Sequence, residues 1–260
     1  MTTVLLAQLA PAPGDLAANA AAAAAAIGMR PEADLAIFPE LFLGGYDLAT
    51  VEQTAVELDG PELEVVRRAA AEAGTAVLIG LAERDGDRVA NSLVAIDEAG
   101  EVVAVHRKIS LWGDETDSFE AGAELKIVEL AGRRIGLLIC YEIEFPEMAR
   151  SLAIAGANLL VTSSANMAPY FADHQLSARA RALDNRIPHC YVNRVGSEMG
   201  LEFVGGTRVV GSDGTVLEEA PERDECLIVT DVPVPERAEG PADYLGNLPP
   251  QLSVAVLPRS

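Results

Sequence analysis

The amino-acid sequence predicts an α/β fold, a mixed-sheet sandwich with helices outside and sheets inside. Apolar runs of strand length alternate along the chain with alanine-rich or amphipathic helical segments, a pattern typical of layered α/β architectures. Several neighbouring strands are separated by turns of two or three residues, and a purely parallel sheet would lack such hairpins. The 260 residues, 50% of them hydrophobic, show no internal repeat and no clear linker, so we expect one domain over residues 1–260.

The first part of the chain predicts strands that alternate with helices. Gly14 and Asp15 precede an alanine-rich helix, and a second, amphipathic helix begins at Pro61 and ends at Gly74, since these residue types favour helix boundaries. A loop at 41–46 follows the second strand. The expected elements are strands at 2–9, 34–38 and 75–81 and helices at 15–28 and 61–73.

The remaining chain predicts hairpins, two further helices and a tail. Turn-prone residues at 98–100 and 131–132 separate pairs of short apolar runs, as expected of hairpins. Residues 233–260 are Pro-rich and predict an extended tail that packs at a subunit interface or against its own domain. The expected elements are strands at 91–96, 101–106, 126–130, 133–139, 158–162, 189–193, 206–211, 215–217 and 227–232 and helices at 146–155 and 169–185.

Composition narrows the choice of partner and compartment. The net charge of −21 makes nucleic acid and anionic membrane surfaces poor partners. The longest uncharged, helix-forming segment, 16–27, is mostly alanine and too short to span a bilayer. No signal-peptide pattern opens the chain. Three cysteines, an odd number, argue against a disulfide framework. We therefore expect a cytoplasmic protein that binds neither nucleic acid nor membrane.

The sequence indicates neither a cofactor nor a metal. No Gly-rich phosphate loop follows a strand, and the three histidines lie far apart without ligand spacing. We expect His174 on a helix surface, and we expect Cys190 and Cys226 in the core.

Three apolar runs end in residues that can do chemistry. Glu40 follows the run at 35–39, Lys108 follows 102–107, and Cys140 follows 135–139. Such folds place chemistry at the carboxyl ends of strands, although a single loop acid or cation is usually just solvated, and a lone cysteine is often core. Together the three provide a base, a cation and a thiol, which suffice for thiol-based acyl transfer without histidine.

Lysine is rare in this chain, with only Lys108 and Lys126 among 19 basic residues. Because arginine supplies nearly all other positive charges in this chain, Lys108 is expected at a position that needs a compact charge with a tunable pKa. Neighbouring strand residues point to opposite faces, so Arg107 should face away from any site that Lys108 faces.

Three blocks of sequence carry a resemblance to a known family. FPELFLGGY at 38–46, HRKISL at 106–111 and CYEIEFPE at 140–147 resemble, in order and spacing, the nitrilase superfamily of carbon–nitrogen hydrolases. RARALDN at 179–185, followed by YVNR at 191–194, is similar to the family's later helix–strand pair. The resemblance covers nearly the whole chain.

The resemblance implies an αββα sandwich whose subunits pair into larger assemblies, so we expect at least a homodimer. It also implies a Glu–Lys–Cys triad at Glu40, Lys108 and Cys140. In that mechanism Glu40 takes the thiol proton, and the thiolate of Cys140 attacks a carbonyl. Lys108 and the backbone N–H of Tyr141 would stabilise the oxyanion.

A second glutamate of the family matches Glu115, which would position the amide or hold Lys108 in place. Asp114 and Glu120 lie nearby and are alternatives to it. Glu147, in a second Phe-Pro-Glu tripeptide, is interpreted as a first-turn helix acid favoured by the helix dipole.

Cys-Tyr-Glu in a chain of this length is similar to the amidase and carbamoylase side of the family. The resemblance therefore implies an amidase that cleaves a small amide through a cysteine thioester, releasing ammonia and a carboxylic acid. Alternatives are an N-carbamoyl amino acid or amine hydrolase, anchored by Arg194 or Arg208, hydrolysis of a nitrile, and a non-enzymatic binding module of the same fold.

Substrate contacts are expected from pocket residues near the triad. The candidates are Tyr46, Trp112, Tyr141 and Asn166. The sequence departs from common family patterns at Gly44, where a hydroxyl residue often stands, and at Glu142, where many small amidases have Asp. Neither change removes a triad group, and both bear on substrate preference.

Overall fold

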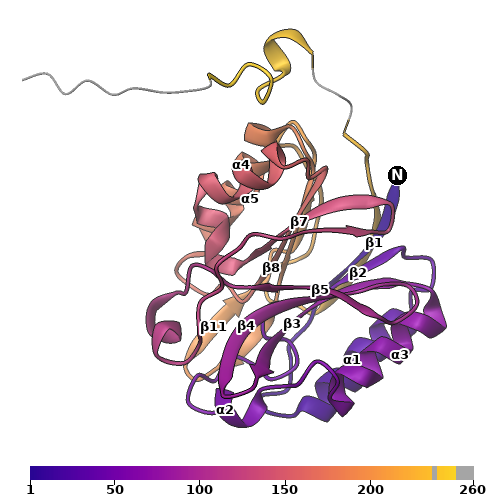
Figure 1. Ribbon diagram of the computed structural model, residues 1–260, viewed down its shortest axis with the longest axis vertical. Coiled ribbons are helices and arrows are strands. Elements are labelled where there is room, and N and C mark those ends of the chain that lie inside the picture. Colours follow the sequence, from indigo (N-terminus) through magenta and orange to yellow (C-terminus); the bar gives the residue numbers. More distant parts are fainter. Residues whose placement is uncertain (236–238, 250–260) are drawn as a thin grey trace, which may run out of the picture.

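The computed structural model describes residues 1–235 and 239–249, and it confirms the predicted α/β sandwich (Figure 1). Two six-stranded mixed sheets stack face to face, with helices on their outer faces. The first sheet has the order β14-β1-β2-β3-β4-β5 and the second has the order β13-β12-β9-β8-β7-β6.

The first sheet contains the N-terminal strands and one late strand. Its strands are β1 Thr2–Gln8, β2 Leu35–Ile37, β3 Ala76–Asp85, β4 Arg88–Ile96, β5 Val102–Arg107 and β14 Cys226–Val232. The second sheet consists of β6 Ile127–Leu130, β7 Arg133–Ile139, β8 Leu159–Ser164, β9 His189–Asn193, β12 Arg208–Val210 and β13 Val216–Glu219. A separate hairpin pairs β10 Val195–Glu198 with β11 Leu201–Val204.

Helices cover the two outer faces. The α-helices are α1 Leu16–Gly28, α2 Val51–Thr54, α3 Pro61–Ala73, α4 Pro146–Ile154 and α5 Phe171–Asn185, and the 3-10 helices are η1 Gly113–Asp117, η2 Cys140–Glu144 and η3 Gly240–Ala242. The Asp15 side chain accepts a hydrogen bond from the Ala18 N–H and so caps α1. Pro61 opens α3, and Gly74 ends it in a left-handed conformation. Pro146 opens α4 with Glu147 in its first turn, as predicted.

Apolar side chains fill three layers of the sandwich. The layer between the sheets contains Val4, Leu6, Leu35, Ile37, Leu78 and Leu93 from the first sheet and Ile135, Leu137, Ile139, Leu159, Val161 and Val192 from the second. Helices α1 and α3 pack on the outer face of the first sheet. Helix α4 packs on the outer face of the second sheet through Leu138, Leu152 and Leu160, and α5 packs there through Ala178, Ala182 and Tyr191.

Several element boundaries differ from the predictions. Strands β3 and β4 continue to a tight turn at Gly86 because the charged Glu83 of β3 is buried and pairs with Arg107 of β5, on the far side of β4. The β10–β11 hairpin was not predicted, and it turns at Met199 and Gly200, which both have positive φ, as a two-residue hairpin loop requires. Helix α5 begins at Phe171 rather than at residue 169.

The tail predicted at 233–260 is partly described. Leu245 packs against the apolar cluster that α4 forms with the second sheet, and the guanidinium of Arg186 lies 4.1 Å from the centre of the Tyr244 ring. Leu248 is exposed. Residues 236–238 and 250–260 of the tail, which include Leu252 and those at 254–256, lie outside the described residues. Among the described helices, none has the length and apolar character that a bilayer crossing needs.

Glycine at position 80 of β3 makes room for the loop that follows β2. A Cβ added to Gly80 would stand 2.6 Å from the Cα of Glu40 and would also meet the carbonyl oxygen of Pro39. Backbone atoms cannot swing aside as a side-chain end can, so only glycine permits this approach. The position of Glu40 therefore depends on the absence of a side chain on the neighbouring strand.

We predict that Gly80→Ala destabilises the fold by about 1–3 kcal/mol, the usual cost of overpacking. This corresponds to a melting temperature lower by roughly 2–12 °C for a chain of this size. Thermal denaturation followed by circular dichroism measures the shift. Gly28→Ala is the matched control, because nothing lies within 4 Å of its added Cβ. Equal melting temperatures for the two variants would contradict the proposed close approach.

Candidate active site

The three predicted strand-end residues meet where the two sheets come together. Glu40 lies just beyond β2 and Lys108 just beyond β5, both from the first sheet, whereas Cys140 follows β7 of the second sheet and opens η2. All three are buried, with Cys140 the most exposed at 8%. The three residues that follow apolar strands in the sequence therefore lie at one common site.

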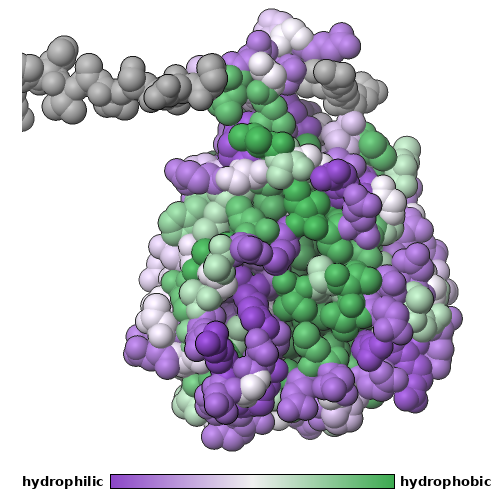
Figure 2. Space-filling view, in the orientation of Figure 1, coloured by the Kyte–Doolittle hydropathy of each residue, from purple (hydrophilic) through white to green (hydrophobic). Residues whose placement is uncertain are grey.

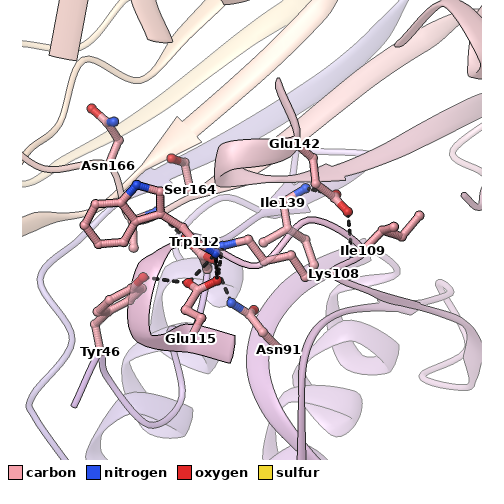
Figure 3. A network of polar contacts seen from close by, with 12 residues as sticks. Tyr46, Asn91, Lys108, Ile109, Trp112, Glu115, Ile139, Glu142, Ser164 and Asn166 are labelled. Carbon is pink, nitrogen blue, oxygen red and sulfur yellow. Dashed lines mark hydrogen bonds and ion pairs between the residues drawn. The ribbon is translucent and has the colours of Figure 1, made fainter. Parts of the chain in front are cut away.

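Lys108 lies between two carboxylates (Figure 3). Its Nζ is 2.7 Å from Oε1 of Glu40, 2.9 Å from Oε1 of Glu115 and 2.8 Å from Oε2 of Glu115. Burial alone would lower the pKa of Lys108, but the Coulombic attraction of the two carboxylates outweighs it, so that the pKa is raised. The ammonium is therefore a permanently charged group with a fixed position.

Further hydrogen bonds hold both carboxylates in place. Asn91 Nδ2 donates to Oε1 of Glu40 at 2.7 Å, and the backbone N–H of Ala165 donates to its Oε2 at 2.9 Å. The Tyr46 hydroxyl donates to Oε1 of Glu115 at 2.6 Å, and the backbone N–H of Trp112 donates to its Oε2 at 2.9 Å. These partners come from both sheets, so the positions of the carboxylates depend on the whole sandwich.

Glu115, rather than its neighbours, is the second carboxylate of the cluster. Its side chain is fully buried, and its pKa is raised chiefly by that burial, with Lys108 acting in the opposite direction. Asp114 and Glu120 are exposed, and Glu120 forms an ion pair with Arg88. The structure thus places Glu115 alone of the three against Lys108.

The Cys140 backbone has a φ of 45°, in the left-handed region that residues other than glycine seldom adopt. Such a conformation persists only where the surroundings enforce it, and it is found most often at functional sites. Here the sharp turn ends β7 and starts η2. The Tyr141 N–H lies in the first turn of η2, where backbone donors have no partner within the helix.

The surroundings of the Cys140 thiol favour its neutral form. Burial raises its pKa, as does the negative charge of Glu40, whereas Lys108 and a hydrogen bond with Ser164 act in the opposite direction. Two carboxylates, Glu40 and Glu115, already flank the single ammonium of Lys108, so a thiolate would bring a third acidic group in its charged form to the site. Transfer of the thiol proton to Glu40 avoids this cost because the total charge stays the same.

Glu142 joins the two loops that carry Cys140 and Lys108. Its carboxylate accepts hydrogen bonds at 2.7 Å from the backbone N–H groups of Ile139 and Ile109, and it lies 2.8 Å from Nε2 of His106. The side chain is fully buried and does not line the cleft above the thiol. The expectation that Glu142 bears on substrate preference is therefore corrected, since its contacts are structural.

Gly44, the other departure from the family pattern, has a steric explanation. A Cβ at this position would stand 3.1 Å from both Cβ and Oγ1 of Thr54 in α2. Thr54 thus fills the space that a hydroxyl residue at position 44 would need.

A small cleft opens above the thiol, with a cavity volume of about 20 Å³. All four predicted substrate-contacting residues, Tyr46, Trp112, Tyr141 and Asn166, line this cleft together with Cys140. Asn166 is 3% exposed, and its Oδ1 has no hydrogen-bond partner among the described residues. The cleft is therefore narrow, largely aromatic and provided with one unpaired amide oxygen.

Four further cleft residues were not predicted from the sequence: Glu144, Met167, Tyr170 and His174. The prediction of His174 on a helix surface was wrong, because its side chain is 2% exposed. Its Nδ1 lies 3.0 Å from the Tyr191 hydroxyl and its Nε2 lies 3.3 Å from Oε1 of Glu144. The Tyr191 hydroxyl in turn bonds to Ser164 at 3.2 Å, so a polar chain connects the cleft wall with the thiol.

The proposed arginine anchors do not reach the cleft. Arg194 is buried, pairs with Glu198 at 2.7 Å and lies over the Phe203 ring, and Arg208 pairs with Glu219 at 2.8 Å. Neither residue lines the cleft. Arg107 faces away from Lys108, as predicted, and binds Glu83 through two nitrogens.

The other two cysteines match the predicted core positions. Cys190 is fully buried between the sheets, and burial raises its pKa to about 12. Cys226 is partly buried and packs against the same layer.

Two stacked sheets that bring a thiol, an ammonium and two carboxylates to one cleft define a class of protein, a thiol-dependent hydrolase of the αββα sandwich type. The family model described as carbon-nitrogen hydrolase matches residues 3–241, and the chain belongs to this family. It is therefore a hydrolase of carbon–nitrogen bonds.

Related sequences include named hydrolases. The chain is 37% identical over 242 residues to an (R)-stereoselective amidase of a Pseudomonas species, covering 92% of this chain and 88% of that protein. It is 39% identical over 231 residues to a protein of Pseudomonas protegens named hydrolase in pqqF 5′ region, covering 87% and 81%.

Solved structures of an amidase from Nesterenkonia sp. AN1 share the fold. One superposes with a TM-score of 0.85 and 31% identity over 95% of this chain and 96% of that chain. A glutamate-to-glutamine variant of that amidase, with the same TM-score and identity over 95% and 93% of the two chains, shows covalent addition of the acetamide moiety of fluoroacetamide at the active site cysteine.

We predict that Lys108→Arg lowers kcat/KM on an amide by at least about 10²–10³, the typical loss when one oxyanion donor is removed. The planar guanidinium cannot occupy a buried position that touches two carboxylates through one nitrogen. Arg107→Lys, which keeps the charge on the opposite face of the strand, is the matched control and should change kcat/KM only slightly. Near-wild-type activity of Lys108→Arg would show that charge alone, without this geometry, is sufficient.

Proposed function

We propose that this protein is an amidase that hydrolyses a small primary amide to a carboxylic acid and ammonia. The observation that carries the proposal is a buried thiol that lines a narrow cleft, in one site with a fixed ammonium and a carboxylate that can take the thiol proton. Membership of the carbon-nitrogen hydrolase family and the amidases among its relatives support it. The small cleft favours a small acyl group.

Acylation begins when the amide carbonyl carbon lies above the sulfur of Cys140. Glu40 accepts the thiol proton as the carbon–sulfur bond forms, and the carbonyl oxygen becomes an oxyanion. Glu40 then gives the proton to the amide nitrogen, the carbon–nitrogen bond breaks, and ammonia leaves a thioester on Cys140.

The oxyanion is stabilised by Lys108 and by the backbone N–H of Tyr141. Donors held in a fixed, buried position need no reorganisation when the charge develops, and this accounts for their large effect. Glu115 contributes by holding Lys108 between two carboxylates, and Tyr46 and the Trp112 N–H hold Glu115. We therefore assign Glu115 a positioning role.

Deacylation repeats the same proton transfers with water. Glu40 takes a proton from the attacking water, the tetrahedral intermediate collapses, and the proton returns to the sulfur as the carboxylic acid leaves. Asn91 and the Ala165 N–H orient the carboxylate of Glu40 for both steps.

The cleft favours this assignment over the carbamoyl amino acid alternative. That substrate carries a carboxylate, and no arginine or lysine lines the cleft among the described residues. The amidase relatives likewise favour amide over nitrile hydrolysis as the first candidate.

Ammonia release from a panel of small aliphatic amides tests the proposal. We expect turnover of at least one amide by the wild type and none by Cys140→Ala, with circular dichroism showing that the variant is folded. Rapid quenching and intact mass should show the acyl group on the wild-type chain during turnover. Turnover by Cys140→Ala, or a chain that never gains the acyl mass, would exclude the covalent mechanism.

Assembly into at least a homodimer and a cytoplasmic location remain predictions. The face shown in Figure 2 has apolar residues gathered across its middle, over the region that carries β5 in Figure 1, and Val103 of β5 is 46% exposed. Static light scattering at micromolar concentration should give at least twice the monomer mass. A monomer there would contradict the expected pairing of subunits.

A further inference from the structure

One ionisable carboxylate borders the cleft without belonging to the buried cluster. Glu144 is the last residue of η2, and its side chain lines the cleft with about one-third of its surface exposed. The only other ionisable groups along the cleft wall, among the described residues, are the Cys140 thiol, the His174 imidazole and the tyrosine hydroxyls. A substrate in the cleft therefore meets a carboxylate but no arginine or lysine.

The neighbours of Glu144 hold its carboxylate without covering it. His174 Nε2 contacts Oε1 at 3.3 Å, and no hydrogen bond to the second oxygen is found in the described part of the chain. Arg181 donates to the backbone oxygen of Glu144 at 3.3 Å and pairs with Asp184, so its guanidinium is engaged away from the side chain. One carboxylate oxygen is thus available to a ligand.

The rest of the cleft also suits a cation. Tyr46, Trp112, Tyr141 and Tyr170 line it, and the faces of aromatic rings attract ammonium groups. Beyond them two carboxylates, Glu40 and Glu115, flank the single ammonium of Lys108. The chain as a whole carries a charge of −21, a field that draws cations to the surface.

We propose that the preferred substrate is an amide whose acyl chain carries an ammonium group, and that Glu144 binds this group. The proposal rests on the proposed amidase function and adds the class of acyl group. Glu144 lies four positions beyond Cys140 in a 3-10 helix, a rise of about 8 Å along the axis at 2.0 Å per residue. Such a separation fits an ammonium group a few carbon atoms from the carbonyl carbon.

Pairs of amides that differ only at the terminal group test the proposal. Butyramide and 3-aminopropionamide form one pair, and valeramide and 4-aminobutyramide form a longer one, with a methyl group replaced by ammonium in each. We expect wild-type kcat/KM to be about tenfold higher for the ammonium member of at least one pair. Succinamate, with a terminal carboxylate, should be the poorest substrate.

Variants at position 144 should change this preference. Glu144→Gln should bring the ratio within the preferred pair close to one, and Glu144→Lys should favour succinamate. Glu147→Gln is the matched control, because Glu147 lies three residues further along, in the exposed first turn of α4, and should keep the wild-type ratio. Should either variant at position 144 fail to fold, the wild type provides a second test, since the ratio should fall as salt is raised from 0.05 to 0.5 M.

The outcomes separate the two proposals. Hydrolysis of the neutral amides as fast as, or faster than, their ammonium partners would overturn the ammonium proposal and leave the amidase function standing. An unchanged ratio in Glu144→Gln would overturn the role of Glu144. If the wild type releases ammonia from none of these amides, the amidase proposal falls, and the ammonium proposal falls with it.

Discussion

The ammonium of Lys108, buried between the carboxylates of Glu40 and Glu115, is the interaction on which the rest of the site depends. A charge removed from water is tolerated only when it is paired and hydrogen-bonded, and loss of one partner of such a pair typically costs about 3–5 kcal/mol. Glu40 follows β2, Lys108 follows β5 and Glu115 lies within η1, so the three groups meet only when the first sheet is assembled. Glu142 then ties the Lys108 loop to the turn that carries Cys140 in the second sheet.

This arrangement determines the chemistry through its charge. With one cation between two anions, the cluster has no spare positive charge with which to stabilise a resting thiolate on Cys140. The thiol is therefore activated only as its proton moves to Glu40, at the moment when a carbonyl is present to accept the sulfur. The same excess of negative charge, together with Glu144 above the thiol, gives the cleft its proposed preference for a cationic acyl group.

The sequence predicted the parts of the site that lie at strand ends. Glu40, Lys108 and Cys140 each follow a run of apolar residues. Because the ends of neighbouring strands lie close together in a sandwich, residues at these positions are expected to share one site. The residues that were missed reach the site by other routes. His174 is polar and lies on a helix with a mixed pattern, so nothing in its sequence neighbours indicated that Tyr191 and Glu144 enclose it.

Glu142 shows a second limit of prediction from sequence. Its two backbone donors are Ile139, at the end of β7, and Ile109, just beyond β5. They become neighbours only after both sheets form, so the structural role of Glu142 could not be read from spacing. The β10–β11 hairpin was missed for a related reason. Its turn requires a positive φ at both Met199 and Gly200, and a methionine in the sequence does not indicate a positive φ. Boundaries set by glycine and proline, such as those of α3, were predicted correctly.

The central claim, a thiol that rests neutral and gives its proton to Glu40, is tested most directly by an ultraviolet titration of the thiolate. The absorbance difference between wild type and Cys140→Ala reports the ionisation of this one thiol as pH rises. The account predicts a wild-type midpoint above that of an ordinary cysteine, about 8.5, and a lower midpoint in Glu40→Gln, which lacks the negative neighbour. A full thiolate signal in the wild type at pH 7 would mean a preformed thiolate paired with Lys108, and would contradict the account.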